Sequence, residues 1–236
     1  MPCRMLVAVG EFQMARLLDD FKLMALNRNE KHELNRDNPD FIHDSGWGIV
    51  LGTSGSLAEL YKKDVPLWQD PHYEAYSDAV SDFVLLHARR ASPGSPVDLS
   101  HTHPFERNGS YFCHNGTITD PQFEDQRDSE NFFHLILEHL KQGEKPEAAI
   151  RQAGSQMKDY TAINLIITYK DKAYILVDHR KNPDYYTMKY IEHPHYTIVS
   201  SETLPSFTGK WTRIPSNTLL ATDTLSHRIN VSEAPS

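Results

Sequence analysis

The sequence has little cysteine: only Cys3 and Cys113 occur in 236 residues, too few for a disulfide framework. It also has no apolar run near the roughly 18 residues that a membrane-spanning helix needs. The apolar start, residues 1–10, is too short for a signal-peptide core and indicates a buried strand. These absences predict a cytoplasmic protein with no membrane partner. They do not exclude one bridge between the two cysteines.

Positive charge is scarce as well. The chain has 24 Lys and Arg against 32 Asp and Glu, for a formal net charge of −8, and no block of basic residues. Binding to a nucleic-acid backbone depends on dense positive charge, so nucleic acid is not an expected partner. The composition, with 39% hydrophobic and 24% charged residues, is that of a globular protein long enough for a substantial core.

Hydrophobic spacing predicts an α+β protein. Helices are expected at residues 12–26, 73–83 and 128–140, and loops at 27–44 and 91–105. Strands are expected at 5–9, 47–51, 83–88, 111–114, 162–169, 173–178, 185–190, 196–200 and 219–222. The late strands follow one another closely, which indicates antiparallel hairpins in layered sheets. One domain is expected over residues 3–222, followed by a polar, frayed tail at 223–236.

Six short stretches hold most of the residues that could do chemistry. They are Cys3-Arg4, HDSGWGI at 43–49, HARRASPG at 87–94, THPF at 102–105, CHNGTI at 113–118 and DSE at 128–130. Each has an ordinary structural explanation when taken alone. A lone cysteine packs as a small hydrophobe, Asn-Gly forms hairpin turns, and an Asp that opens a helix caps it. Trp47 and Cys113 are expected in the core.

A zinc site is the alternative of a different class. His101, His103, Cys113 and His114 are suitable ligand types, and the first two would share one face of an extended segment. Their spacing matches no strong zinc signature. The sequence therefore predicts neither a metal nor another cofactor.

In combination and in this order, the motifs resemble the class II glutamine amidotransferases, which are N-terminal-nucleophile hydrolases. Small stand-alone members, described as glutamine amidotransferases or as hydrolases of γ-glutamyl amides, have segments most similar to CRML, GWGI, HARRAS, THPF and HNGTI of this sequence. The resemblance extends from Cys3 to about Ser201. It implies a four-layer αββα sandwich, in which two antiparallel sheets lie between helical layers.

The resemblance also implies the catalytic residues. Cys3 would attack the side-chain amide of the substrate, with its own α-amino group as the base, and form a glutamyl thioester. The tetrahedral intermediate carries an oxyanion that needs preorganised donors. The Asn115 side-chain amide and the Gly116 backbone N–H match the family's pair in HNG.

Substrate recognition follows from the same resemblance. Arg89 matches the family arginine in H-x-R, whose guanidinium fork suits the α-carboxylate of a glutamyl group. Asp128 matches the acidic residue that receives the α-ammonium. Supporting roles around the site are expected for Arg4, His87, Ser92 and His103.

The start of the chain departs from the family, in which the cysteine becomes the first residue once the initiator Met is removed. Here the sequence reads Met1-Pro2-Cys3. An amide nitrogen is no base, because its lone pair is delocalised into the carbonyl. Further cleavage could expose Cys3, the two residues could be an artefact, or the protein could be a non-catalytic relative that binds a γ-glutamyl ligand or a partner. The retained substrate-pairing residue types favour an active enzyme.

The expected ligand is glutamine or another small γ-glutamyl molecule. Synthases of this family append an acceptor domain after the glutaminase domain, and this chain shows none. A separate subunit that accepts the ammonia is therefore one open partner, and a second copy of the chain is another. Free-standing hydrolysis of a γ-glutamyl amide is the reading that we favour.

Overall fold

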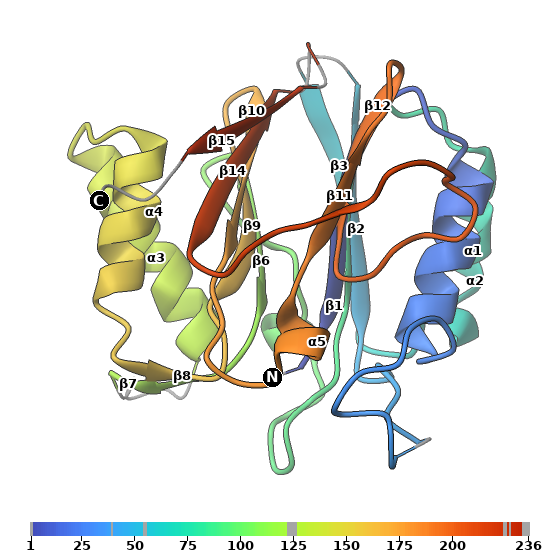
Figure 1. Cartoon of the computed structure of the whole chain (residues 1–236), viewed down its shortest axis with the longest axis horizontal. Coiled ribbons are helices and arrows are strands. Elements are labelled where there is room, and N and C mark those ends of the chain that lie inside the picture. The colour runs from blue at the N-terminus through green and yellow to red at the C-terminus, as the bar shows by residue number, and fades with distance from the viewer. Residues whose placement is uncertain are drawn as a thin grey trace.

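The computed structural model describes residues 2–38, 40–53, 56–121, 127–223, 226 and 228–232. Two large sheets lie face to face, with helices covering both outer faces (Figure 1). The strand pairings in both sheets are antiparallel. This is the four-layer αββα sandwich that the resemblance implied, and the α+β prediction is confirmed.

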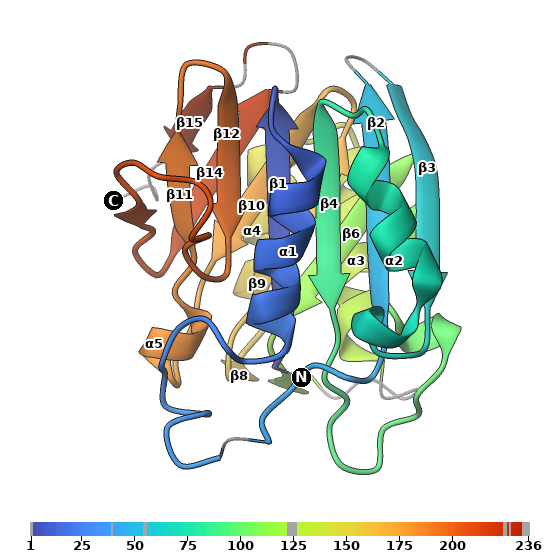
Figure 2. The same cartoon turned by 90° about the vertical axis from the view of Figure 1, so that its right-hand side faces the viewer.

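The first sheet contains the strand that directly follows Cys3. Its order is β13 (Thr212–Arg213), β11 (Lys189–Glu192), β12 (Tyr196–Ser200), β1 (Arg4–Gly10), β4 (Phe83–Ala88), β2 (Trp47–Thr53) and β3 (Ser56–Lys63). Helices α1 (Met14–Ala25) and α2 (Pro71–Ala75) cover its outer face (Figure 2). β1 therefore lies in the middle of a sheet, between β12 and β4.

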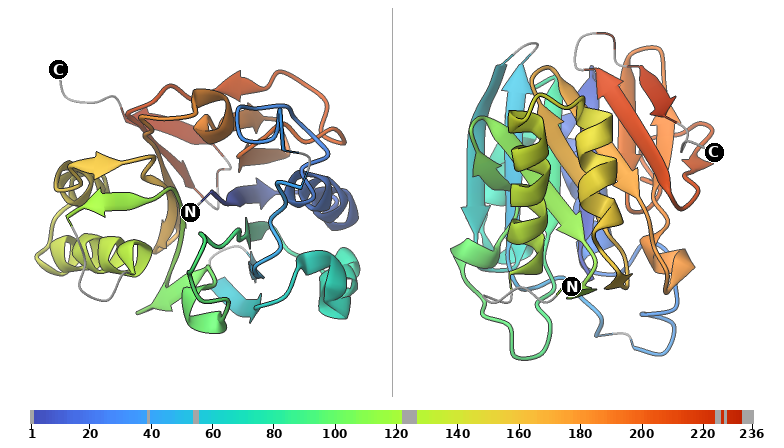
Figure 3. Two further views of the ribbon diagram at one scale, coloured as in Figure 1. Left: turned by 90° about the horizontal axis from the view of Figure 1, so that it is seen from below. Right: turned by 90° about the vertical axis from the view of Figure 1, so that its left-hand side faces the viewer.

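The second sheet contains the strand that leads to the Asn-Gly turn. Its order is β15 (Ile229–Ser232), β14 (Thr218–Asp223), β10 (Lys172–Val177), β9 (Asn164–Tyr169), β6 (Ser110–Asn115) and β5 (Phe105–Arg107). Helices α3 (Asp128–Lys141) and α4 (Pro146–Ser155) cover its outer face (Figure 3). A small pair, β7 (Ile118–Asp120) and β8 (Asp159–Tyr160), and the short helix α5 (Pro183–Tyr186) lie at the same end as the N-terminus.

Buried apolar side chains fill all three spaces between the four layers. The apolar run of β1, residues 5–9, illustrates this packing. Leu6 and Ala8 pack toward α1, whereas Met5, Val7 and Val9 pack between the two sheets. Successive side chains of a strand point to opposite faces. A strand covered on both faces therefore reads as a continuous apolar run rather than an alternating one.

Two predicted elements are wrong. The helix expected at 73–83 ends at Ala75 and continues only as a 3₁₀ turn to Asp78, after which Val80 is 94% exposed. The strand expected at 185–190 contains α5 instead, with β11 starting at Lys189. Pro183 at the start of α5 and the left-handed backbone of Asn182 (φ 46°) favour a turn over an extended strand here.

Other elements carried too weak a pattern to be predicted. α4 buries only Ala149, Ile150 and Ala153, so its apolar stripe is narrow. The tail expected to be frayed contains β15, which pairs with β14. Residues 224, 225, 227 and 233–236 of that tail lie outside the described part of the chain. No helix among the described residues has the length and apolar character that a membrane span requires.

The contact between β2 and the THPF segment gives a stability prediction. A Cβ at Gly48 would overlap the carbonyl oxygen of His103 and lie 2.6 Å from Cδ of Pro104. Gly48→Ala should lower the free energy of unfolding by ~1–3 kcal/mol, since the overlap is with backbone that cannot move freely. Urea denaturation measures this change.

A matched control comes from α4. A Cβ at Gly154 would lie 3.5 Å from Cδ1 of Ile163, which is ordinary van der Waals contact. Gly154→Ala should therefore be neutral or stabilising by up to ~1 kcal/mol through helix propensity. Equal stability of Gly48→Ala and the unchanged protein would contradict the close approach.

Candidate functional site

Cys3 lies where the two sheets meet. It is 1% exposed, and its backbone N–H donates to Oδ1 of Asn115 at 2.7 Å, a contact between residues 112 positions apart. Burial raises the pKa of the Cys3 thiol, against the backbone N–H of Arg90 and the Arg89 guanidinium, which favour the thiolate. The thiol is therefore not a ready-made thiolate and would need a base to become a nucleophile.

Cys3 and Cys113 are both buried free thiols, so the single bridge left open by the sequence is absent. Cys113 lies on β6 and packs between the two sheets, as predicted for a core residue. Trp47 is likewise fully buried and donates from Nε1 to Oδ2 of Asp70 at 3.2 Å. Both residues are therefore core residues, although the Cys113 thiol lies within electrostatic range of Cys3.

The Asn-Gly turn begins where β6 ends. Oδ1 of Asn115 is occupied by the Cys3 N–H, while Nδ2 is buried and has no acceptor among the described residues. Gly116 has φ of 155°, and a Cβ there would overlap the carbonyl oxygen of Ala162. Only glycine fits this position. The turn therefore holds the Asn115 side-chain amide, with its Nδ2 donor, close to the Cys3 backbone.

Arg89 follows β4 directly and is fully buried. Its guanidinium donates to the carbonyl oxygens of Ser45 at 3.3 Å and Pro96 at 2.8 Å. Its backbone also pairs with Ser45 N and Gly46 O. Ser92 accepts from Ser95 N at 2.9 Å and so shapes the loop that presents Pro96. Two of the motifs found in the sequence, HDSGWGI and HARRASPG, thus fold around one buried cation.

Asp128 is the first residue of α3, and Arg127 rather than Asp128 occupies the N-cap position. Oδ2 of Asp128 accepts from Ile118 N at 3.0 Å, and Oδ1 accepts from Ser129 N at 2.8 Å. These bonds tie the start of α3 to the segment just after Gly116. The Asp128 carboxylate is one of the charges that act on the Cys3 thiol, as is Arg89. A buried cation and a carboxylate therefore both lie in the electrostatic neighbourhood of Cys3.

Three buried histidines form a neutral group beside this site. The rings of His87 and His103 lie 4.5 Å apart, Nε2 of His87 lies 3.3 Å from the His114 carbonyl oxygen, and Nδ1 of His114 lies 2.8 Å from Ser129 Oγ. Burial lowers the pKa of His87 to about 3 and of His114 to about 4, and lowers that of His103 well below its usual value. All three are neutral at physiological pH.

The zinc alternative finds no support in this arrangement. No group of three or more His, Cys, Asp or Glu side chains within the described ranges could hold a metal ion. His101 instead pairs with Asp98 at 2.8 Å. His103 and Asp128 line a common cavity of about 20 Å³, which has room for one water molecule.

Arg4 is buried and forms an ion pair with the buried carboxylate of Glu202. Its guanidinium also lies over the ring of Tyr185, 4.0 Å from the ring centre. The Tyr185 hydroxyl donates to the carbonyl oxygen of Cys3 at 2.8 Å, and Nε2 of His43 lies 3.0 Å from that hydroxyl. The sequence carries no local signal for Tyr185, whose segment is predicted as a strand, and His43 stands in the HDSGWGI motif without a predicted role.

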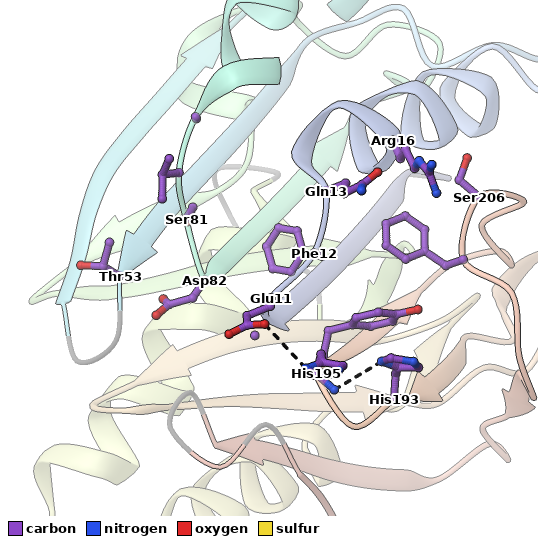
Figure 4. A pocket seen from close by; sticks show the side chains of 15 residues that line it. Glu11, Phe12, Gln13, Arg16, Thr53, Ser81, Asp82, His193, His195 and Ser206 are labelled. Atoms are coloured by element: carbon purple, nitrogen blue, oxygen red, sulfur yellow. Dashed lines mark hydrogen bonds and ion pairs between the residues drawn. The ribbon is translucent and has the colours of Figure 1, made fainter.

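A separate cavity of about 720 Å³ lies at the opposite end of β1, shown in Figure 4. It is lined by Glu11, Phe12, Arg16, His193 and His195, among others. Gly10, the β1 residue that lines this cavity, is seven residue steps from Cys3, a distance of about 23 Å along an extended strand. None of the site residues predicted from the sequence lines this cavity, so its size says nothing about the chemistry at Cys3.

Comparison with known proteins identifies the family. Residues 33–229 match the family described as glutamine amidotransferases class-II. The chain belongs to the class II glutamine amidotransferases. The matched span includes Arg89, Asn115, Gly116 and Asp128 but starts after Cys3, so the placement of Cys3 in the site rests on its contacts in the structure.

Curated relatives from two species carry the name gamma-glutamyl-hercynylcysteine sulfoxide hydrolase. The one from Mycobacterium tuberculosis is 28% identical over 92 residues, which is 39% of this chain and 36% of the relative. The one from Mycolicibacterium smegmatis is 29% identical over 92 residues, with 39% and 37% covered. The match thus spans little more than a third of either relative.

Solved structures of class II amidotransferases share the fold across nearly the whole chain. The glutamine phosphoribosylpyrophosphate amidotransferase from B. subtilis aligns with a TM-score of 0.66 at 15% identity, over 97% of this chain and 49% of that one. A glutamine aminotransferase class-II domain protein from Silicibacter pomeroyi aligns with a TM-score of 0.61 at 17% identity, over 97% and 99%. At these identities the likeness establishes the αββα fold alone.

The neutral histidines predict a loss of stability in mild acid. The unfolded chain binds protons on His87, His103 and His114 below about pH 6.5, whereas the folded chain does not until the pH is far lower. The unfolded state thus binds more protons, so stability falls as the pH falls. Each histidine should cost about 2 kcal/mol at about pH 5. Urea denaturation between about pH 7.5 and pH 5 measures the total.

This pH window separates the histidines from carboxylates whose pKa is lowered on folding. His32 and His43, whose pKa values burial also lowers, add to the same loss, and Glu202, whose pKa burial raises, acts in the opposite direction. Asp70 and Asp98 have lowered pKa values in the folded state, so their contribution is lost only below their unfolded pKa of about 4. A free energy of unfolding that stays constant down to about pH 5 would mean that the three imidazoles become protonated without unfolding.

Proposed function

We propose that this class II glutamine amidotransferase hydrolyses a γ-glutamyl amide through a thioester on Cys3. The observation that carries the proposal is the contact between Cys3 N and Asn115 Oδ1. It places the nitrogen that would act as the base, the thiol and the side-chain amide of Asn115 within one small buried region. Arg89 and Asp128 stand near enough to act on the same thiol.

The proposed reaction has two acyl transfers. The free α-amine of Cys3 takes the proton of its own thiol, and the thiolate attacks the γ-carbonyl carbon of the substrate. The amine then returns the proton to the departing ammonia or amine, which leaves a glutamyl thioester. Water, deprotonated by the same amine, attacks the thioester and releases glutamate and the thiol.

Asn115 would stabilise both tetrahedral intermediates. Its Oδ1 orients the Cys3 nitrogen while its buried Nδ2 donates to the oxyanion, with the Gly116 backbone N–H as the second donor by family resemblance. One such donor is worth about 3–4 kcal/mol of transition-state stabilisation. The two ends of one amide thus serve the base and the oxyanion together.

Arg89 and Asp128 would select the glutamyl group. The buried guanidinium would bind the α-carboxylate and the Asp128 carboxylate the α-ammonium, so that an amide without either charge would lose the corresponding charge-assisted contact. Around them, Ser92 shapes the Arg89 loop, Arg4 packs on Tyr185, and His87 and His103 add no charge.

The names of the two mycobacterial relatives support a γ-glutamyl conjugate as well as glutamine among the substrates. With glutamine, the ammonia would be released to solvent or to a separate synthase subunit. The second candidate function is binding of a γ-glutamyl ligand without turnover. It is favoured by the present bond between Pro2 and Cys3, which makes the Cys3 nitrogen an amide.

A comparison of two N-termini distinguishes these functions. A chain that begins at Cys3 should hydrolyse glutamine or a γ-glutamyl amide, whereas a chain that retains Pro2 should be slower by at least about 10²-fold, because it lacks the general base. Intact mass defines each sample, and ammonia or amine release measures turnover. Cys3→Ala should abolish activity in the first chain.

Cys113→Ala is the matched control, since this second buried thiol packs between the sheets and has no role in the proposed reaction. It should retain activity wherever it folds. Equal activity of the chain that begins at Cys3 and the chain that retains Pro2 would exclude the Cys3 α-amine as the base. Ligand binding without turnover by the Cys3 chain would favour the non-catalytic function.

The carboxylate role of Arg89 predicts a KM effect. Arg89→Lys should raise KM by about 10- to 100-fold, because a lysine ammonium cannot form the forked pair and a hydrogen bond to a charged group is worth about 1.5–3 kcal/mol. Steady-state kinetics on glutamine measure the change.

The neighbouring arginine is the control. The Arg90 side chain donates to the Ile42 carbonyl and lies over the Phe41 ring. Its backbone N–H, which faces the Cys3 thiol, is kept in Arg90→Lys. Arg90→Lys should leave KM within about twofold of the unchanged enzyme, well below the loss of a charged hydrogen bond. An unchanged KM in Arg89→Lys would remove the proposed carboxylate contact.

A further inference from the structure

The carbonyl oxygen of Cys3 has a partner from the far end of the chain. The hydroxyl of Tyr185, in α5, donates to it at 2.8 Å across 182 positions of sequence. Tyr185 is fully buried, and burial raises the pKa of its hydroxyl well above the usual value. The phenol is therefore a neutral donor at any pH at which the enzyme would work.

The position of Tyr185 is held from several sides. Glu33 accepts from the backbone N–H groups of Asp184 and Tyr185 at 2.9 and 3.0 Å. Arg4 lies over the ring and donates from Nη1 to the Tyr185 carbonyl at 3.1 Å. Phe41 packs edge-on to the same ring at 5.7 Å. These contacts hold the Tyr185 side chain in one rotamer, so its hydroxyl is preorganised.

A count of protons gives the direction of the hydrogen bonds. Nδ1 of His43 lies 3.1 Å from the Ala25 carbonyl, Nε2 lies 3.0 Å from the Tyr185 hydroxyl, and that hydroxyl lies 2.8 Å from the Cys3 carbonyl. These three contacts require three protons. A neutral imidazole and a neutral phenol bring two, and burial holds the pKa of His43 well below its usual value.

The Tyr185 hydroxyl donates its proton to Cys3, whose carbonyl oxygen can only accept. The contact without a proton is therefore one of the two that His43 makes, and the imidazole tautomer decides which. In either tautomer the Cys3 carbonyl receives a hydrogen bond from a buried phenol that lies against His43.

We propose that Tyr185 is a positioning residue that sets the orientation and the basicity of the Cys3 α-amine. The inference rests on the proposed function, in which that amine is the base. Asn115 holds the nitrogen of Cys3 and Tyr185 holds its carbonyl oxygen, so both ends of the residue that carries the thiol are anchored. A donor on the carbonyl also withdraws electron density from the adjacent carbon, which lowers the pKa of the α-amine.

This lowering favours catalysis. An α-amine has an ordinary pKa of about 7.7–8.0, so it is mostly protonated at neutral pH. A lower value increases the neutral fraction that can accept the thiol proton. The titratable and charged groups that face Cys3 and Tyr185 are Arg4, His32, Glu33, His43, Arg89, Cys113, Asp128, Tyr186 and Glu202. All of them remain when only the Tyr185 hydroxyl is removed.

Tyr185→Phe in the chain that begins at Cys3 is the test. We expect kcat to fall about 3- to 10-fold, which corresponds to the loss of one neutral hydrogen bond, with KM within about twofold. The acidic limb of the kcat/KM profile should move to higher pH, because the amine becomes more basic. A lost packing contact alone would not move that limb.

Tyr186→Phe is the matched control, because this neighbouring tyrosine is also buried and its hydroxyl contacts Thr161 rather than Cys3. Its acidic limb should stay in place. An unmoved limb in Tyr185→Phe, or the same kinetic change in both variants, overturns the proposal. Thermal unfolding of both variants shows whether stability is matched.

A measurement without turnover separates this proposal from the proposed function. NMR of the chain labelled with ¹³C-cysteine gives signals from two residues, and the Cys113→Ala variant shows which signal belongs to Cys3. The apparent titration midpoint of the Cys3 α-amine should be higher in Tyr185→Phe than in the unchanged chain. If no γ-glutamyl amide is hydrolysed but the midpoint rises, the proposed function fails and the positioning role stands. If hydrolysis occurs and the midpoint does not move, only the positioning role fails.

Discussion

The hydrogen bond from Cys3 N to Asn115 Oδ1 joins the two sheets at the one end of the sandwich where the candidate chemistry is gathered. Its donor precedes β1 in the middle of one sheet, and its acceptor ends β6 in the other. The bond can form only when the sheets are stacked and both strands end at the same level. The apolar layer between the sheets, which includes Met5 and Cys113, maintains that stacking.

Burial determines the electrostatics of this end of the molecule. The histidines around Cys3 are kept neutral by desolvation, whereas the Arg89 guanidinium is a cation because arginine keeps its proton even when buried. Fixed positive charge at the site therefore comes from arginine, and its sign does not change with physiological pH. Glu202 balances Arg4 through a buried ion pair. In the proposed reaction, Arg89 is the guanidinium that would bind a substrate carboxylate.

Elements with strong, regular patterns were predictable. The sequence indicated β1, α1, β4 and α3 to within a few residues, because apolar side chains repeat at the spacing that each element buries. It failed at residues 73–83 and 185–190, where turn-forming residues and local packing override the apolar spacing. α4 escaped notice because it covers its sheet with a stripe of small side chains.

For the site, the sequence by itself determined the family pattern and pointed to Cys3, Arg89, Asn115, Gly116 and Asp128 as candidate residues, since each lies in a short motif whose residue types are constrained by chemistry. Only the tertiary structure decided that Tyr185 reaches the Cys3 backbone, that His43 reaches the Tyr185 hydroxyl and that Arg4 stacks against Tyr185. The physical reason is distance along the chain. A hydrogen bond that spans 182 residues depends on how two sheets and a short helix pack, and such packing leaves no local periodicity in the sequence.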